Sequence, residues 1–284
     1  MKTYAEYVEG FLKLREAGRG CPLGGFPFPT PTQRPGGPKA LLFSPHPDDE
    51  CIFGGFPLRL KREANFEIVN VAVTQGSNKG RQAERLEELS QACRYLDFGL
   101  VTTRENGLEK ITLKTRDSDP AAWSEAVGCV EAILRTHRPA MIFIPHERDA
   151  NSTHEGTNLL VMAALRKAGM DFPCRVVETE FWAPMAAPNL MIEIPPTDLA
   201  SLLTALSFHV GEVSRNPYHL SLPAWMMDNV RRGGEVVGGQ GGAVPDFPFA
   251  TLYRMTRWNG EALEPVLKTN RVVPATDSVA ELMK

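Results

Sequence analysis

The chain has 284 residues, of which 43% are hydrophobic and 23% are charged, and its formal net charge is −3. A chain of this length and composition can bury a sizeable core as one large domain. Acidic and basic residues are mixed and no basic block stands out, so we expect no nucleic-acid partner. No window approaches the ~18 apolar residues of a membrane span, so we expect no membrane partner either.

The cysteine pattern and the N-terminal composition indicate a reducing compartment. The cysteines are five in number and widely separated, at Cys21, Cys51, Cys93, Cys129 and Cys174. This is neither a disulfide framework nor a Cys-x-x-Cys motif, so we expect most of them to be small buried apolar residues. Residues 1–20 are rich in Lys, Arg and Glu and lack the apolar segment of a signal peptide. We therefore expect a cytoplasmic protein.

The first 38 residues are expected to form a helix and an irregular arm. Tyr4 to Ala17 has the pattern of a short amphipathic helix. Residues 18–38 are rich in proline and glycine, which exclude regular structure. We expect this arm to wrap the surface or to reach a neighbouring subunit, so a homo-oligomer is possible.

Strand and helix signals alternate from Lys39 onward. Strands are expected near residues 40–45, 67–74, 109–114 and 140–145, and helices near residues 50–64, 79–96, 121–136 and 154–168. Alternation of this kind predicts an α/β fold with a Rossmann-like, mostly parallel sheet and helices on both faces. Residues 175–182 and 189–194 would add edge strands. We therefore expect residues 1–284 to form one domain, with an α/β core at 39–194 and a C-terminal elaboration at 195–284.

The C-terminal elaboration has weaker signals. A helical pattern ends at Phe208-His209, and residues 216–219 are predicted to form a loop that could close over a site at the sheet. Residues 233–242 are rich in glycine, which could serve either close backbone approach to a sugar or a flexible loop, and the loop is the preferred interpretation. Residues 249–258 have the pattern of a closing strand.

The segment Ser-Pro-His-Pro-Asp-Asp-Glu at residues 44–50 directly follows the apolar run at 40–43. A hydrolytic zinc centre needs three ligands, an open position for water and a carboxylate that takes the proton of that water. Side chains of consecutive residues diverge, so one of Asp48 and Asp49 can bind a metal while the other faces the water. The alternative is a helix N-terminus with favourable acidic residues. His46 favours the metal site, because a cap has no use for an imidazole between two prolines.

A second cluster of histidines and acids, from His146 to Glu155, follows the apolar run at 140–144. In an open parallel sheet, ligands bind outside the carboxyl ends of the strands where the strand order reverses. The two strands would then bring His154 to His46 and Asp49. Taken alone, His154 could instead be an exposed residue of a helix's first turn, and His146 a hydrogen-bonded loop residue. No Gly-x-Gly-x-x-Gly or Gly-x-x-x-x-Gly-Lys turn follows the first strand, which argues against a nucleotide.

These motifs resemble the PIG-L/LmbE family of zinc-dependent de-N-acetylases, which remove an acetyl group from an N-acetylglucosaminyl or related amino-sugar group. The resemblance rests on Pro-His-Pro-Asp-Asp-Glu, on Thr-Gln-Gly at residues 74–76, on Arg-Leu-Glu-Glu at 85–88, and on the cluster at 149–154. It runs from about Lys39 to His154. The expected substrate is a small N-acylated amino sugar or a conjugate of one.

The resemblance implies roles for individual residues. His46, Asp49 and His154 match the metal ligands, Asp48 matches the general base, and Arg85 stands where family members carry a substrate-binding arginine. The expected cofactor is one Zn²⁺, although a set of two histidines and one carboxylate also accepts Fe²⁺ or Co²⁺.

One position departs from the family pattern. Many members have a histidine three residues before the last ligand, where this chain has Asn151, which can donate a hydrogen bond but cannot carry a proton. The candidate oxyanion donors or acids are therefore His146, Asn151 and His219, and Asn216 is a candidate substrate contact in the same loop as His219.

Two alternatives to an amino-sugar deacetylase remain. The first is a non-catalytic metal-binding member of the same fold, in which Asn151 marks lost catalysis. The presence of Asp48 argues against it, because a binding protein needs the ligands but not the base. The second is a deacylase of a non-sugar amide.

Overall fold

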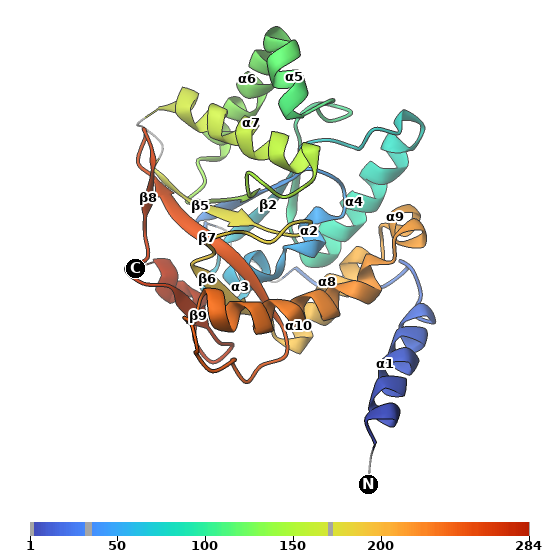
Figure 1. Cartoon of the computed structure of the whole chain (residues 1–284). Coiled ribbons are helices and arrows are strands. Elements are labelled where there is room, and N and C mark those ends of the chain that lie inside the picture. The colour runs from blue at the N-terminus through green and yellow to red at the C-terminus, as the bar shows by residue number, and fades with distance from the viewer. Residues whose placement is uncertain (1–2, 32–35, 170–172, 284) are drawn as a thin grey trace.

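The computed structural model describes residues 3–31, 36–169 and 173–283 (Figure 1). The strands in these ranges are β1 (Lys39–Ser44), β2 (Glu67–Ala72), β3 (Gly99–Thr102), β4 (Met141–Pro145), β5 (Cys174–Thr179), β6 (Leu190–Glu193), β7 (Ala250–Trp258), β8 (Leu263–Pro265) and β9 (Arg271–Val273). The helices there are α1 (Tyr4–Arg19), α2 (Asp49–Ile52), α3 (Gly55–Ala64), α4 (Gln82–Leu96), α5 (Leu113–Ser118), α6 (Pro120–His137), α7 (Ser152–Ala168), α8 (Pro196–Leu206), α9 (Val210–Arg215) and α10 (Tyr218–Val236), with the 3-10 helices η1 (Lys79–Arg81) and η2 (Val279–Met283).

The strands form one mixed sheet in the order β3-β2-β1-β4-β5-β7-β6-β9, with β8 paired to β7. The pairs from β3 through β5 are all parallel. β7 runs antiparallel to both β5 and β6. The predicted α/β fold with a mostly parallel sheet and flanking helices is confirmed.

The sheet is buried on both faces, which explains why its central strands are almost continuously apolar. In β1, Ala40 and Leu42 face a core that includes residues of α3, α4, α8 and α10. Leu41 and Phe43 face a second core built with α6 and α7. Figure 1 shows these two groups of helices on opposite sides of the sheet.

The strand order reverses at β1, which lies between β2 on one side and β4 on the other. The carboxyl ends of β1 and β4 are therefore adjacent, at Ser44 and Pro145. The chain continues from these ends into α2 and α7, which carry the two polar clusters. This arrangement is the one that the sequence predicted for the switch point.

The structure corrects the strand that the sequence predicted near residues 109–114. Thr112 begins a helix instead, because its hydroxyl accepts a hydrogen bond from the Thr115 amide at 3.1 Å and caps α5. Ile111 is buried as an anchor of the preceding loop. The strand that pairs with β2 on the side away from β1 is β3, which the sequence did not reveal. The helix expected at 50–64 is divided into α2 and α3.

The C-terminal elaboration also differs from prediction. β5 and β6 are not at the edge of the sheet, because β7 lies between them and pairs with both. Only Asn216 and Pro217 of the predicted loop at 216–219 precede α10, which begins at Tyr218. Residues 233–236 of the predicted glycine-rich loop lie within α10 instead, and a Cβ on Gly233 would meet the Met191 sulfur at 2.3 Å. The glycine lets the helix approach the sheet closely.

The N-terminal helix is confirmed and extends to Arg19, with no buried residue. It leaves the body of the molecule near α10 (Figure 1), where Gly18 lies against Leu220. Phe28 of the following arm stacks on Phe208 at 5.7 Å, so this part of the arm wraps the surface as expected. Residues 32–35 of the arm lie outside the described ranges.

Two expectations from composition can be compared with the structure. Cys51, Cys93 and Cys174 are buried, as predicted, and none of the five cysteines forms a disulfide. Within the described ranges no helix has the length and apolar character needed to cross a membrane.

Candidate functional site

A cavity of about 460 Å³ opens where β1, β2 and β4 end. It is lined by residues that follow each of these strands, including His46, Asp48, Thr74 and Asn151. α9 and α10 close its other side. Both clusters that the sequence singled out therefore reach one cavity.

His46, Asp49 and His154 have ligand atoms that all lie within 4.8 Å of one another. The Asp49 Oδ2 atom is 3.6 Å from His46 Nδ1 and 3.4 Å from His154 Nε2. Ligands at 2.0–2.1 Å from a tetrahedral zinc ion stand about 3.3 Å apart, so these spacings fit such an ion. The separations of 3.4 and 3.6 Å are too long for good hydrogen bonds between Asp49 and the two histidines.

His154 Nε2 supports the same interpretation. The atom is buried and has no hydrogen-bond partner among the described residues. A buried polar atom without a partner is costly, and a bound cation would satisfy it. The donor set of two imidazoles and one carboxylate also suits a divalent transition metal.

Asp149 determines which nitrogen of His154 is available. Its Oδ2 atom lies 2.7 Å from His154 Nδ1, while its Oδ1 atom accepts hydrogen bonds from the Phe181 and Ala183 amides at 3.0 and 3.1 Å. Although burial raises the pKa of Asp149, hydrogen bonds from His146 and His154 hold it well below its ordinary value. An ionised Asp149 keeps the proton of His154 on Nδ1, which leaves the Nε2 lone pair for a metal.

Asp48 lies in the turn between the two ligands of the first motif. Its backbone has φ 119°, a left-handed value that is rare for residues other than glycine. It precedes α2 without a side-chain capping bond, so the capping alternative is not supported for this residue. Burial and the charge of Asp49 raise its pKa, while Arg85 acts in the opposite direction. A raised pKa makes a carboxylate a better proton acceptor.

The three candidate donors are placed differently. Asn151 lines the cavity and caps α7, because its Oδ1 atom accepts the Thr153 and His154 amides at 3.0 and 3.3 Å. Its side-chain NH₂ group is then the remaining donor. His146 lies outside the cavity lining, with Nε2 at 3.0 Å from the Ala183 carbonyl oxygen and Nδ1 accepting the Arg148 amide. His146 is therefore not placed to act on a molecule in the cavity.

His219 is likewise outside the cavity lining. It is the second residue of α10, and burial lowers its pKa. Tyr218, the residue before it, faces the cavity instead. The cavity is thus lined by the neighbour of the predicted residue, because the segment is helical and consecutive side chains diverge.

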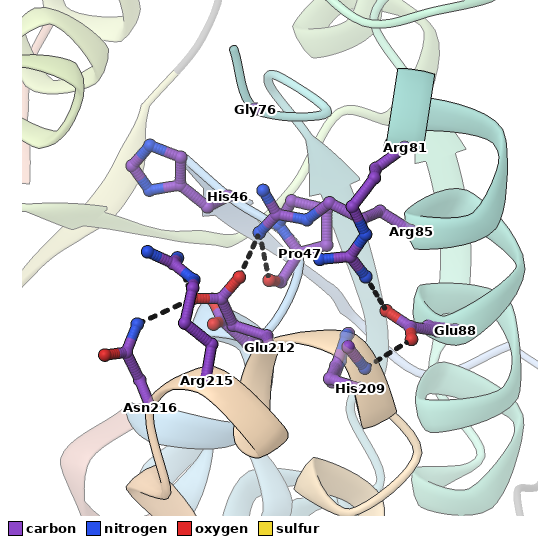
Figure 2. Close-up of polar contacts among 12 residues, drawn as sticks. His46, Pro47, Gly76, Arg81, Arg85, Glu88, His209, Glu212, Arg215 and Asn216 are labelled. Carbon is purple, nitrogen blue, oxygen red and sulfur yellow. Dashed lines mark hydrogen bonds and ion pairs between the residues drawn. The ribbon is translucent and has the colours of Figure 1, made fainter. Parts of the chain in front are cut away.

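Arg85 and Asn216 meet the same acidic residue from opposite sides (Figure 2). Arg85 lines the cavity, donates from Nη2 to the Pro47 carbonyl oxygen at 3.1 Å, and lies 3.9 Å from Glu212 Oε2. Asn216 donates to Glu212 Oε1 at 3.1 Å but does not line the cavity. Asn216 thus orients Glu212 and does not itself reach the cavity.

Sequence reasoning missed three cavity residues of the C-terminal elaboration, Glu212, Arg215 and Tyr218. Glu212 is buried and also contacts Arg215. Burial and the charge of Asp48 raise the pKa of Tyr218 to about 12, so its phenol remains a neutral donor. Trp182 contacts Tyr218 edge to face at 5.9 Å and forms part of the same wall. The Asn-Pro pair at 216–217 was a sequence signal that a helix begins at Tyr218. No sequence signal pointed to Glu212 as a cavity residue.

Comparison with known families gives one match that overlaps both motifs. Residues 41–165 match the PIG-L family, described as GlcNAc-PI de-N-acetylase. This range contains His46, Asp48, Asp49 and His154.

Solved structures give the fold independently. The chain resembles the conserved protein TT1542 from Thermus thermophilus at 21% identity, covering 76% of this chain and 94% of that one, with TM-score 0.57. It resembles GalB, the 4-carboxy-2-hydroxymuconate hydratase from Pseudomonas putida, at 14% identity, with coverage of 77% and 95% and TM-score 0.58. It resembles the N,N′-diacetylchitobiose deacetylase from Pyrococcus horikoshii at 16% identity, with coverage of 90% and 93% and TM-score 0.54. Since these relatives include a hydratase and a deacetylase, the fold alone does not select a reaction.

Proposed function

Residues 41–165 form a PIG-L family domain, and from this premise we propose that the protein is a metal-dependent hydrolase that removes an N-acetyl group from an amino sugar or an amino-sugar conjugate. The observation that carries the proposal is the convergence of His46, Asp49 and His154 at one point beside Asp48, at a cavity that His46, Asp48 and Asp49 line. The resemblance to a chitobiose deacetylase is consistent with it.

The metal would be held by His46, Asp49 and His154, with zinc as the first candidate and Fe²⁺ or Co²⁺ as alternatives. When bound there, a divalent cation would polarise the amide carbonyl and lower the pKa of a water molecule towards ~7. The unpartnered Nε2 atom of His154 supports this assignment.

Asp48 is the proposed general base. Its carboxylate lines the cavity and makes no capping bond, so it is free to accept a proton from the attacking water. The same carboxyl group can then protonate the departing amine. This return step matters here because Asn151 cannot supply a proton.

Neutral donors at the cavity wall are proposed to stabilise the tetrahedral oxyanion and to orient the sugar. The NH₂ group of Asn151 and the phenol of Tyr218 are the candidates for the oxyanion. Arg85 and Glu212 place a donor and an acceptor side by side, which suits the hydroxyl groups of a sugar. Trp182 offers an aromatic surface for the apolar face of a sugar ring.

Metal analysis of the purified protein, together with acetate release from a panel of N-acetylated sugars, tests the proposal. The panel includes N-acetylglucosamine and N,N′-diacetylchitobiose. The Asp48→Ala variant is expected to retain stoichiometric metal while kcat falls by ~10²–10⁴. His154→Ala is expected to lose the metal itself. Wild-type turnover by Asp48→Ala would refute the assigned base.

The same measurements separate the two alternatives. A non-catalytic member would bind one metal ion and release acetate from no amide in the panel. A deacylase of a non-sugar amide would release the acyl group from N-acetylated amines that lack a sugar and leave the sugars intact. For a deacylase of either substrate class, loss of activity with a chelator and its return with zinc would support the metal-dependent reaction.

A further inference from the structure

Glu50, the last residue of the Pro-His-Pro-Asp-Asp-Glu motif, lies beneath the candidate site and is fully buried. One carboxylate oxygen, Oε2, accepts the Asp48 amide at 3.0 Å. The other, Oε1, lies 2.7 Å from His209 Nε2 and accepts the Cys51 thiol at 3.1 Å. Burial of a carboxylate costs free energy unless hydrogen bonds compensate it, so the partners of Glu50 indicate what the residue is placed to hold.

The bond to the Asp48 amide acts on a strained part of the backbone. The backbone of Asp48 has φ 119°, a value that residues other than glycine rarely adopt. Such conformations persist only where surrounding contacts hold them, and they are concentrated at functional sites. Because the carboxylate of Asp48 makes no capping bond, this backbone conformation determines where the carboxylate points. Glu50 therefore holds the turn that aims the proposed base.

His209 connects the same carboxylate to the opposite wall of the cavity. It directly precedes α9, and its carbonyl oxygen accepts the amides of Glu212 and Val213 at 3.0 and 2.9 Å. Glu212 lines the cavity. One buried pair, Glu50 and His209, thus joins the turn that carries Asp48 to the helix that carries Glu212, across 159 residues of sequence.

Glu50, Cys51 and His209 also have ligand atoms close together, which raises the alternative of a second metal site. The distances exclude it. Separations of 2.7 and 3.1 Å from Glu50 Oε1 are those of direct hydrogen bonds, whereas the first group has separations of 3.4 and 3.6 Å. Burial also raises the pKa of the Cys51 thiol, so the thiolate needed for a metal is disfavoured.

We propose that Glu50 and His209 are positioning residues, which fix the strained Asp48 turn and couple it to the Glu212 wall. This inference rests on the proposed hydrolysis, since it assigns the pair to the base of that reaction. Neither residue lines the cavity, so neither touches the substrate. Their removal should misplace Asp48 without removing a metal ligand.

The test compares Glu50→Ala with Glu50→Gln, whose carbonyl can still accept the Asp48 amide. The matched control is Glu178→Ala, which removes another buried glutamate that pairs with Arg254 outside the cavity. With N,N′-diacetylchitobiose as the probe and zinc bound, Glu50→Ala is expected to lower kcat ~100-fold with KM within about threefold, as for a misaligned catalytic group. Glu50→Gln should restore kcat to within about tenfold of the wild type.

A second readout needs no turnover. Hydrogen exchange of the Asp48 amide in the metal-free protein should be accelerated in Glu50→Ala at least about tenfold, because a buried donor loses its acceptor, and should be unchanged in Glu178→Ala. His209→Ala is expected to show a smaller acceleration, since Glu50 keeps its bond to the amide but loses its own anchor.

The inference is overturned if the Asp48 amide is equally protected in Glu50→Ala and Glu178→Ala, or if kcat falls no further in the first than in the second. If Glu50→Ala does not fold, His209→Ala takes its place, and exchange of the Asp48 amide in that variant must still exceed the exchange in Glu178→Ala. If the wild type binds zinc but releases no acetate, the proposed hydrolysis of this probe fails, while the exchange of the Asp48 amide still decides whether the pair holds the turn.

Discussion

Replacing Asp149 by asparagine tests how the structure prepares His154 for a metal. Asp149 Oδ1 accepts two backbone amides, those of Phe181 and Ala183, and an amide NH₂ cannot take that place. The oxygen of an asparagine would therefore remain there, and its NH₂ group would face His154 Nδ1. A nitrogen that faces a donor must become the acceptor, so the proton of His154 would move to Nε2. In that tautomer Nε2 cannot bind a metal.

The expected loss of zinc affinity follows from the contact of Asp149 with His154 Nδ1, the ring nitrogen that does not face the metal site. Loss of such a partner usually reduces metal affinity by about 10- to 100-fold, which corresponds to about 1.4–2.8 kcal/mol. The value should fall in the upper part of this range, because Asp149 is 1% exposed and its 2.7 Å contact with His154 is shielded from water. The substitution keeps the size of the side chain, so little of the loss should come from packing.

Zinc affinity can be measured by competition with a chromophoric chelator at pH 7. The matched control is Asp198→Asn, which changes another buried aspartate whose partner is Arg62 of α3, outside the cavity lining. We expect the control to bind zinc as the wild type does. Equal affinity in Asp149→Asn and Asp198→Asn would refute the tautomer argument.

Three further predictions concern the surroundings of the site. Arg59→Leu should lower the free energy of unfolding in urea by about 3–5 kcal/mol. Arg59 is fully buried, and its guanidinium donates hydrogen bonds to backbone carbonyls of the C-terminal segment. The control Arg62→Leu changes a more exposed arginine and should lower the free energy of unfolding by only about 1 kcal/mol or less. Gly76→Ala should raise KM about tenfold at unchanged zinc content, because a Cβ at φ 80° would stand 2.2 Å from Arg85 Nη1. Tyr218→Phe should lower kcat by about 10- to 100-fold through loss of an oxyanion donor. Since burial raises the pKa of Tyr218 to about 12, the ratio of wild-type to variant kcat should remain constant up to about pH 10, whereas a phenol with an ordinary pKa would lose its proton there.

The first half of the site could be predicted because its residues are tied to strand ends. His46 and His154 are 108 residues apart, but each follows a buried parallel strand, and parallel strands end at the same edge of a sheet. The short apolar runs and their polar ends are local features of the sequence. The reversal of strand order then leaves few places where the two ends can meet.

The second half could not be predicted in the same way. Glu212 reaches the cavity because α9 is held by contacts with distant residues, including Gly211 with Glu88 at 2.8 Å and His209 with Glu50. A helical pattern shows which face of a helix is apolar, but not which strand end the helix covers. The same limit explains why β7, which pairs with two strands from other parts of the chain, was not placed between them.

Asn151 departs from the family resemblance, and the structure gives it a definite task. Its Oδ1 atom accepts the amides of Thr153 and His154, so the side chain starts the helix that brings His154 to His46 and Asp49. With this oxygen occupied, Asn151 keeps only a neutral donor for the oxyanion, and it can never protonate a leaving amine. His146 and His219 lie outside the cavity lining, so the proposed reaction does not assign that task to either of them. In the proposed reaction, the proton that Asp48 takes from water must then be the one delivered to the amine. On this proposal the position of Asp48, and of the buried Glu50 proposed to hold its turn, is more important in this chain than in a relative with a second acid.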